Sequence, residues 1–404
     1  MAWLKRLMLA LVLLFPGSAG AADSEDLARL IEANRWPVVA GETGLGGPGA
    51  DRIAGWAGGA QHFLLGENHG NAGMARFATS LSMTLAGKGY GFTAVEADPF
   101  MTGEMVRLLG GGKPAFAAWL GADQRQRAVP FYVWSEEADF ILSAMRRGPV
   151  WGLDQSFLAA AHLHLDEIAR LTRSPKARAL ATELAGEARK DVLGFIGKVD
   201  LNRLTALRTA MGKGDPAIVL TDQFIESTII YAPFVRSDGT SVYAGNLRRE
   251  TMMKRLFQAN LDAAARRTGK PPKVLLKFGA NHLMRGLSMT HMPSFGSYIA
   301  ETTLAKGGHV FNLRMLCGPG TRQRLFDDSD YDCEADEWAP IAAAFKPYLA
   351  ATGDTLFDLR PLRDRPRLWK DWPADAKELV WSYDAVVIIG PSGPSHFLAP
   401  LPKP

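Results

Sequence analysis

The sequence predicts an α/β fold in which helices flank a mostly parallel central sheet and a helical insert forms a cap or extra layer. Short apolar runs recur along the chain, and polar residues and then a helical segment follow each run. This alternation is typical of parallel α/β sheets. After the third such run, helix-like apolar spacing continues over about residues 158 to 258, which predicts the insert.

Length and charge limit the classes of protein to which the chain can belong. It has 404 residues, with 46 Lys and Arg against 42 Asp and Glu. We assign residues 23–404 to a single α/β hydrolase-like domain, because this length buries an ample core. The dispersed, nearly balanced charge is not that of a nucleic-acid-binding protein. The expected partner is a small-molecule substrate. The sequence does not determine the oligomeric state.

Residues 1–22 have the pattern of a signal peptide. Lys5 and Arg6 precede a short apolar run over residues 7–15, and small residues follow at 19–21. This pattern predicts cleavage near Ala21 or Ala22 and a periplasmic or secreted protein. The alternative is an uncleaved anchor. No later apolar run reaches about 18 residues, so we expect no membrane span after signal removal.

The chain has two cysteines, Cys317 and Cys333. An exported protein meets an oxidising compartment, in which we expect the two thiols to form a disulfide. Two isolated thiols are the alternative.

Ionisable or amide side chains follow four of the apolar runs, at residues 62–65, 92–95, 150–153 and 274–278. Ligands bind outside the carboxyl ends of parallel strands, so we expect these side chains to share one crevice. Carboxylates this close to one another need a cationic residue, a metal ion or a shared proton. The residues that we place there are Glu67, His69, Glu96, Asp98, Asp154, Asn281 and His282.

Each of these residues also has a purely structural interpretation. Glu67 and His69 are compatible with a helix cap in a surface turn, Glu96 and Asp154 with ordinary helix starts, and His282 with a hydrogen-bonded core histidine. The functional interpretation depends on the fact that such residues follow all four predicted strands.

The ordered motifs resemble the superfamily of erythromycin esterases, ChaN-like haem-binding proteins and TraB-type proteins. Residues 64–70 resemble its G-E-x-H signature, and Glu96 resembles the acidic residue that ends its second strand. Residues 249–253 resemble its R-(D/N)-x-x-M helix start, and residues 279–282 resemble its G-A-x-H motif. The match runs in order across roughly residues 60 to 315.

The chain departs from the family pattern at two points. One residue separates Glu67 from His69, as in ChaN-like and TraB-type members, where erythromycin esterases have two. Glu250 occupies a position that is usually Asp or Asn. These departures weaken the case for a macrolide substrate.

The resemblance implies hydrolysis of an ester, lactone or amide by activated water, with no required cofactor. His69 would be the general base, and Glu67 or Glu96 would orient its ring. His282 would be a second acid or base or would stabilise the oxyanion. Arg249 would pair with the carboxylates or hold an anionic substrate. The remaining supporting positions are Asp98, Asp154 and Asn281.

Two alternatives use overlapping residues. A divalent metal held by Glu67, His69, Glu96 and His282 would also activate water. A periplasmic haem- or iron-binding protein would use ligands from the region between His282 and Met292. A catalytically silent relative is a third class of interpretation.

Two other catalytic motifs are not expected. No G-x-S-x-G nucleophile elbow is present. The sequence of residues 44–49 matches the G-x-G-x-x-G pattern of nucleotide-binding loops. We nevertheless interpret residues 41–49 as a loop and do not expect a helix to begin at Pro48. Nucleotide binding is therefore not expected.

Overall fold

The computed structural model describes residues 18–237, 242–326, 329–333 and 339–401. Most of the predicted signal peptide, residues 1–17, lies outside the described residues. Helix α2 (Ser18–Ala33) includes the predicted cleavage site.

A mostly parallel central sheet organises the described part of the chain, which confirms the predicted fold class. Its nine strands have the order β2-β1-β10-β11-β7-β3-β6-β4-β5. Every neighbouring pair from β11 to β5 is parallel, whereas the pairs that join β2, β1, β10 and β11 are antiparallel. The strands are β1 (Arg35–Gly41), β2 (Gly44–Gly46), β3 (His62–Glu67), β4 (Tyr90–Val95), β5 (Val150–Gly152), β6 (Lys273–Gly279), β7 (Val310–Cys317), β10 (Asp354–Asp358) and β11 (Ala385–Ile389).

The central strands are buried on both faces. Phe63 and Leu65 of β3 belong to one hydrophobic cluster, and Leu64 between them belongs to another. Alternate residues of a strand point to opposite faces, so a strand covered on both sides has a continuous apolar sequence. This is why residues 62–65 and 274–278 could be recognised as strands.

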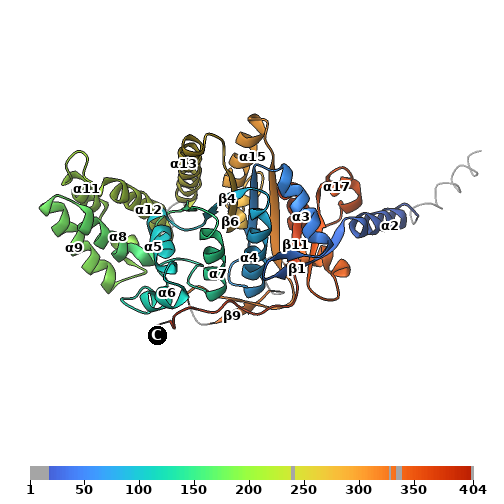
Figure 1. Ribbon diagram of the computed structural model, residues 1–404, viewed down its shortest axis with the longest axis horizontal. Helices are drawn as coiled ribbons and strands as arrows, with labels where there is room; N and C mark the ends of the chain where they lie inside the picture. The colour runs from blue at the N-terminus through green and yellow to red at the C-terminus, as the bar shows by residue number, and fades with distance from the viewer. Residues whose placement is uncertain (1–17, 238–241, 327–328, 334–338, 402–404) are drawn as a thin grey trace, which may run out of the picture.

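Helices before and after the central strands cover the sheet. They are α3 (Pro48–Gly59), α4 (Ala72–Ala86), α5 (Pro99–Leu109), α6 (Lys113–Leu120), α7 (Ser135–Met145), α14 (Ala280–Leu283), α15 (Phe295–Ala305), α16 (Ala339–Phe345), η2 (Lys346–Tyr348), α17 (Arg360–Arg363), η3 (Pro366–Trp369) and α18 (Ala374–Ser382). Helix α2 and helix α17 lie at the opposite end of the molecule from the helical insert (Figure 1).

Helices fill the chain between β5 and β6, where the insert was expected. They are η1 (Leu158–Ala160), α8 (Ala161–Leu171), α9 (Pro175–Lys190), α10 (Phe195–Lys198), α11 (Leu201–Thr209), α12 (Ile218–Arg236) and α13 (Val242–Thr268). Helices α8, α9, α11 and α12 form a block beside the sheet (Figure 1) with a hydrophobic core of its own. Helix α13 returns to the sheet and brings Arg249 with it.

Among the described residues, one helix, α12, is long and apolar enough to cross a membrane by length and composition. Asp222 and Glu226 interrupt its apolar sequence. The core helix of a soluble protein passes the same test, and α12 packs against α8, α10 and α13. The absence of a membrane span remains a prediction.

The prediction of a loop over residues 41–49 was wrong. Residues 44–46 form strand β2, and helix α3 begins at Pro48. Proline is well placed at the first position of a helix, where its missing N–H has no intrahelical partner to lose. Gly47 supplies the preceding turn with a φ of 83°, which is open to glycine at little cost.

The predicted disulfide between Cys317 and Cys333 is present, with a Cα–Cα distance of 5.7 Å. It joins the end of β7 to a two-stranded antiparallel hairpin of β8 (Thr321–Gln323) and β9 (Asp330–Asp332). The bridge therefore restrains a segment that lies over the carboxyl ends of the strands.

Replacing both cysteines by serine is expected to lower the free energy of unfolding by about 3 kcal/mol. The bridge closes a loop with a sequence separation of 16 residues, and the chain-entropy model gives this magnitude for such a loop. Urea unfolding of the oxidised wild type and the double variant measures the difference. An unchanged midpoint and slope would show that the bridge does not stabilise the fold.

Candidate functional site

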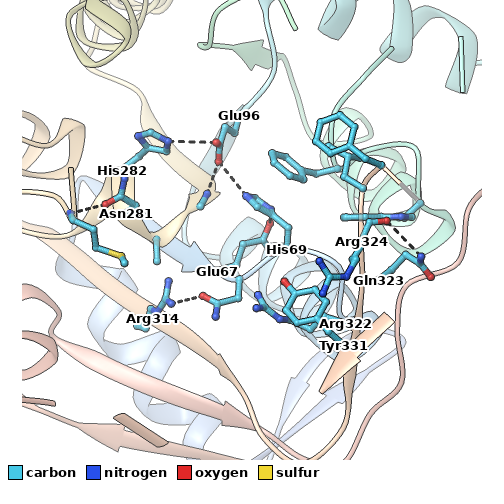
Figure 2. Close-up of a pocket in the computed structure, with 18 of the residues that line it drawn as sticks. Glu67, His69, Glu96, Asn281, His282, Arg314, Arg322, Gln323, Arg324 and Tyr331 are labelled. Atoms are coloured by element: carbon cyan, nitrogen blue, oxygen red, sulfur yellow. Dashed lines mark hydrogen bonds and ion pairs between the residues drawn. The ribbon is translucent and has the colours of Figure 1, made fainter. Parts of the chain in front are cut away.

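A cavity of about 650 Å³ lies at the carboxyl ends of the central strands. Its floor contains the charged side chains that the sequence placed at strand ends, namely Glu67, His69, Glu96 and His282. Figure 2 shows these side chains on one side of the cavity and the hairpin residues Arg322, Arg324 and Tyr331 on another. The volume is in the range of small-molecule sites.

Strand order explains why these residues meet. β3, β6, β4 and β5 are consecutive neighbours in the sheet, as the crevice hypothesis required. Glu67 pairs with Gly279 across β3 and β6, and Val95, which precedes Glu96, pairs with Lys277. The parallel arrangement therefore brings segments more than 200 positions apart to one edge.

His69 lies between two carboxylates. Its Nδ1 is 2.9 Å from Oε1 of Glu67, and its Nε2 is 3.3 Å from Oε2 of Glu96. Burial acts to lower the pKa of His69, but the hydrogen bonds to the two carboxylates outweigh burial and raise this pKa above its usual value. The ring is therefore more basic than a free imidazole, and either carboxylate stabilises its protonated form.

Phe131 fixes the orientation of the His69 ring. The two rings stack with centroids 3.5 Å apart and planes inclined by 8°. Phe131 has a φ of 66°, a left-handed backbone conformation that is unusual for an aromatic residue. Backbone outliers of this kind cluster at functional sites. The sequence analysis did not single out this residue.

A buried lysine beneath the cavity balances the negative charge of Glu67. Nζ of Lys277 in β6 is 2.5 Å from Oε1 of Glu67 and 2.7 Å from Oε2 of Glu137 in α7. All three side chains are almost completely buried. Burial acts to raise the pKa of Glu67, but Lys277 and His69 lower it below its usual value. For Glu137, burial dominates over the Lys277 charge and raises the pKa to about 7.

Glu96 connects both histidines to the cation of α13. Its Oε2 accepts a 2.5 Å hydrogen bond from the backbone N–H of Gly279, and its Oε1 accepts a 2.9 Å hydrogen bond from Arg249. Oε1 is also 3.4 Å from Nε2 of His282. Burial acts to raise the pKa of Glu96, but the two histidines hold it well below its usual value. A Cβ at Gly279 would lie 3.0 Å from both Glu96 and His69, so this close approach favours glycine.

His282 is held by a second carboxylate. Its Nδ1 is 2.6 Å from Oε1 of Glu250, the position where the sequence departs from the family pattern. Burial and the nearby Arg249 act to lower the pKa of His282, but Glu96 and Glu250 raise it to about 9. His282 is therefore protonated at neutral pH, and Glu250 belongs to the site.

The supporting residues occupy different places. Asp154 lies outside the cavity lining and accepts hydrogen bonds of 2.9 and 2.5 Å from Arg249. Asn281 lines the cavity, and its side chain accepts from the backbone N–H of Met289. Asp98 does not line the cavity. Its Oδ1 accepts from the backbone of Met101 at the start of α5 and lies 3.0 Å from Nε2 of buried His164 in α8, which gives Asp98 a structural role.

Buried charges within apolar strands are the sequence signal for the residues that were missed. Lys277 is the single charged residue between Val274 and Phe278, and Arg314 is the single charged residue of β7. A charge is rarely buried without a partner, so each marks a polar site. Glu137 has no comparable signal, because acidic residues are ordinary in the first turn of a helix such as α7.

The sequence also allowed a divalent metal at Glu67, His69, Glu96 and His282, and this alternative stays a prediction. Within the described residues, no group of three His, Cys, Asp or Glu side chains is placed to hold an ion. Glu67 contacts Lys277, and Glu96 contacts Arg249. The negative charge of each carboxylate is therefore balanced by a cationic residue, which is one of the three possibilities that the sequence left open. The haem alternative also stays a prediction: both nitrogens of His282 face carboxylates, and His291 is exposed.

No protein-family model and no curated protein sequence matches the chain. Solved structures show that it has the fold of an erythromycin esterase, which confirms the predicted resemblance at the level of the fold. A mutant of the erythromycin esterase EreC in its open conformation superposes with a TM-score of 0.60 at 15% identity, over 90% of this chain and 99% of that chain.

Two further structures share this fold. A succinoglycan biosynthesis protein superposes with a TM-score of 0.59 at 12% identity, over 93% of this chain and 98% of that chain. A Bacillus cereus protein superposes with a TM-score of 0.58 at 13% identity, over 93% of this chain and 99% of that chain. At these identities the likeness establishes architecture and leaves the chemistry to the site.

Proposed function

We propose that the protein is a hydrolase that activates water with His69 and cleaves an ester, a lactone or an amide. The observation that supports this proposal is the His69 ring, held between Glu67 and Glu96 on the floor of a cavity of small-molecule size. We also propose that the protein is exported after cleavage near Ala21 or Ala22, as the signal-peptide pattern predicts.

The first step needs a neutral His69. With Nδ1–H donating to Glu67, Nε2 accepts a proton from water, and the water oxygen attacks the carbonyl carbon of the substrate. The C=O π electrons move to oxygen, which forms the tetrahedral oxyanion. Glu67 and Glu96 stabilise the imidazolium, as a carboxylate does in hydrolytic triads.

The second step uses the protonated His282. Collapse of the tetrahedral intermediate breaks the C–O or C–N bond, and the leaving group takes a proton from Nε2 of His282. Its carboxylate partners keep this imidazole charged at neutral pH. One histidine thus serves as the base and the other as the acid. Lys277 and His69 lower the pKa of Glu67, and the two histidines lower that of Glu96, so both carboxylates are ionised at neutral pH.

Hydrolysis of ester, lactone and amide panels by purified wild-type protein tests the proposal. We expect turnover of at least one class and its loss in His69→Ala and Glu67→Gln. The matched control is His309→Ala, because His309 is exposed and precedes β7 at the opposite end of the strand. Equal activity in all four proteins, or no turnover of any class by the wild type, would contradict the proposal.

A further inference from the structure

The wall of the cavity formed by β7 and the hairpin carries positive charge. Arg314 comes from β7, Arg322 from β8, and Arg324 follows β8. The two carboxylates on the floor, Glu67 and Glu96, already face Lys277 and Arg249 from other elements. Arg322 and Arg324 therefore define a chemically distinct part of the cavity, which Figure 2 shows across from His282, whereas Arg314 lies on the side of Asn281.

Tyr331 of β9 contacts two of these arginines, Arg322 and Arg324. The guanidinium carbon of Arg322 lies 4.5 Å from the centre of the Tyr331 ring, and that of Arg324 lies 4.9 Å from the same centre. Stacking on an aromatic face orients a guanidinium group and leaves its N–H groups in its own plane. Such planar donors match the oxygens of a carboxylate or a phosphate.

The hairpin is fixed relative to His69. The backbone N–H of Gln323 donates a 2.8 Å hydrogen bond to the carbonyl of Gly70, the residue after His69. Gly70 has a φ of 93°, and a Cβ there would lie 2.4 Å from the carbonyl oxygen of Gln323, so the two segments are in close contact. The Cys317–Cys333 bridge holds the other end of the hairpin on β7. The separation between the arginines and the proposed base is therefore set by the fold.

Apolar side chains also line the cavity. Phe131 covers His69, and Leu325 and Phe326 belong to the segment that follows Arg324. A ligand in the cavity can therefore contact the polar floor, these apolar side chains and the arginines of the hairpin.

We propose that the substrates carry an anionic group, a carboxylate or a phosphate, separated by an apolar segment from the carbonyl that is cleaved. Arg322 and Arg324 bind this group, and Tyr331 positions both of them. The assignment of a cleaved carbonyl rests on the proposed hydrolase function, whereas the anion subsite itself is testable by binding alone.

Calorimetric titration at low salt with glutarate, butyl phosphate and uncharged glutaramide tests the subsite. We expect the wild type to bind at least one anion tenfold or more tightly than glutaramide. A preference between glutarate and butyl phosphate identifies the carboxylate or the phosphate as the natural group. Equal affinity for all three probes, or no binding of either anion, would overturn the proposal.

The variants locate the binding. Arg322→Gln combined with Arg324→Gln is expected to weaken anion binding at least tenfold, and Arg324→Gln alone at least threefold. Arg324 is exposed, so the single variant decides the outcome if the double variant does not fold. The matched control combines Arg248→Gln with Arg266→Gln, two exposed arginines of α13 outside the cavity lining, and retains wild-type affinity. Loss of affinity in the control, or none in the subsite variants, would refute the assignment.

The two proposals fail separately. His69→Ala removes the proposed base and is expected to keep the preference for the anion over glutaramide. Anion binding without hydrolysis by the wild type would retain the subsite and reject the hydrolase. Hydrolysis that does not distinguish anionic from neutral substrates would retain the hydrolase and reject the subsite.

Discussion

Replacement of Lys277 by methionine is expected to lower the free energy of unfolding by about 3–5 kcal/mol, the magnitude typical of breaking a buried ion pair. Lys277 is completely buried, and it is the cation that contacts both Glu67 and Glu137. Methionine fills a similar volume but removes the cation from two buried carboxyl groups, so that Glu137 loses this donor and Glu67 keeps only the contact with His69. Because a native domain is stable by only about 5–15 kcal/mol, this variant approaches the limit of folding.

Glu137→Gln is the matched control for this loss. The pKa of Glu137 is raised to about 7, so its carboxyl group is already partly protonated near neutral pH. An uncharged amide keeps an oxygen that can accept from Lys277, and we expect a stability change of less than about 1 kcal/mol, as for a substitution that retains its hydrogen bond. Urea unfolding at pH 7 measures both variants. Similar stabilities for the two variants would show that the Lys277 charge does not stabilise the site.

Glu96→Gln is expected to lower the activity of the proposed hydrolase by about 10²-fold or more and to move both limbs of its pH profile to lower pH. General acid–base catalysis contributes about 10²–10⁴-fold, and Glu96 contacts both the base and the acid. For the wild type we expect kcat/KM to rise as His69 loses its proton, at a pH above 6.5, and to fall as His282 loses its proton, at about pH 9.

The direction of the shift follows from the charge that is removed. The Glu96 carboxylate raises the pKa of both histidines, so its replacement by a neutral amide lowers both values. Glu250 contacts only His282 of the two histidines, and Glu250→Gln is therefore expected to move the falling limb alone. The profile of kcat/KM against pH for the three proteins measures these shifts. An unmoved rising limb in Glu96→Gln would remove His69 from the role of base.

The central sheet and the floor of the cavity could be predicted because buried strands have a simple apolar pattern in the sequence. Strands covered on both faces are continuous apolar runs, and parallel strands place the residues that follow them at one edge. Glu67, His69, Glu96 and His282 were found in this way, and the structure brings their side chains within 3.4 Å of one another in successive pairs. The cysteine pair was equally accessible, because only one pairing exists.

Two predictions from the local sequence were wrong, because the same residues suit two different local structures. Pro48 was interpreted as a residue that does not open a helix, yet it starts α3, because proline disrupts a helix interior and suits the first position. Asp98 was grouped with the site because it follows a strand, but its side chain turns to the start of α5 and to His164. The strand end fixes the place of the backbone, and local hydrogen bonds decide where the side chain points.

The sequence alone determined the strand ends, the pair of histidines, the carboxylates beside them and the disulfide. Only the tertiary structure decided how those charges are compensated, because Lys277 and Glu137 are 140 positions apart and Arg249 reaches Glu96 from α13, the last helix of the insert. It also placed Phe131 on His69 and the arginine wall across the cavity. Periodicity in a sequence reports which side of an element is buried, whereas the partner of a buried charge depends on which elements pack together.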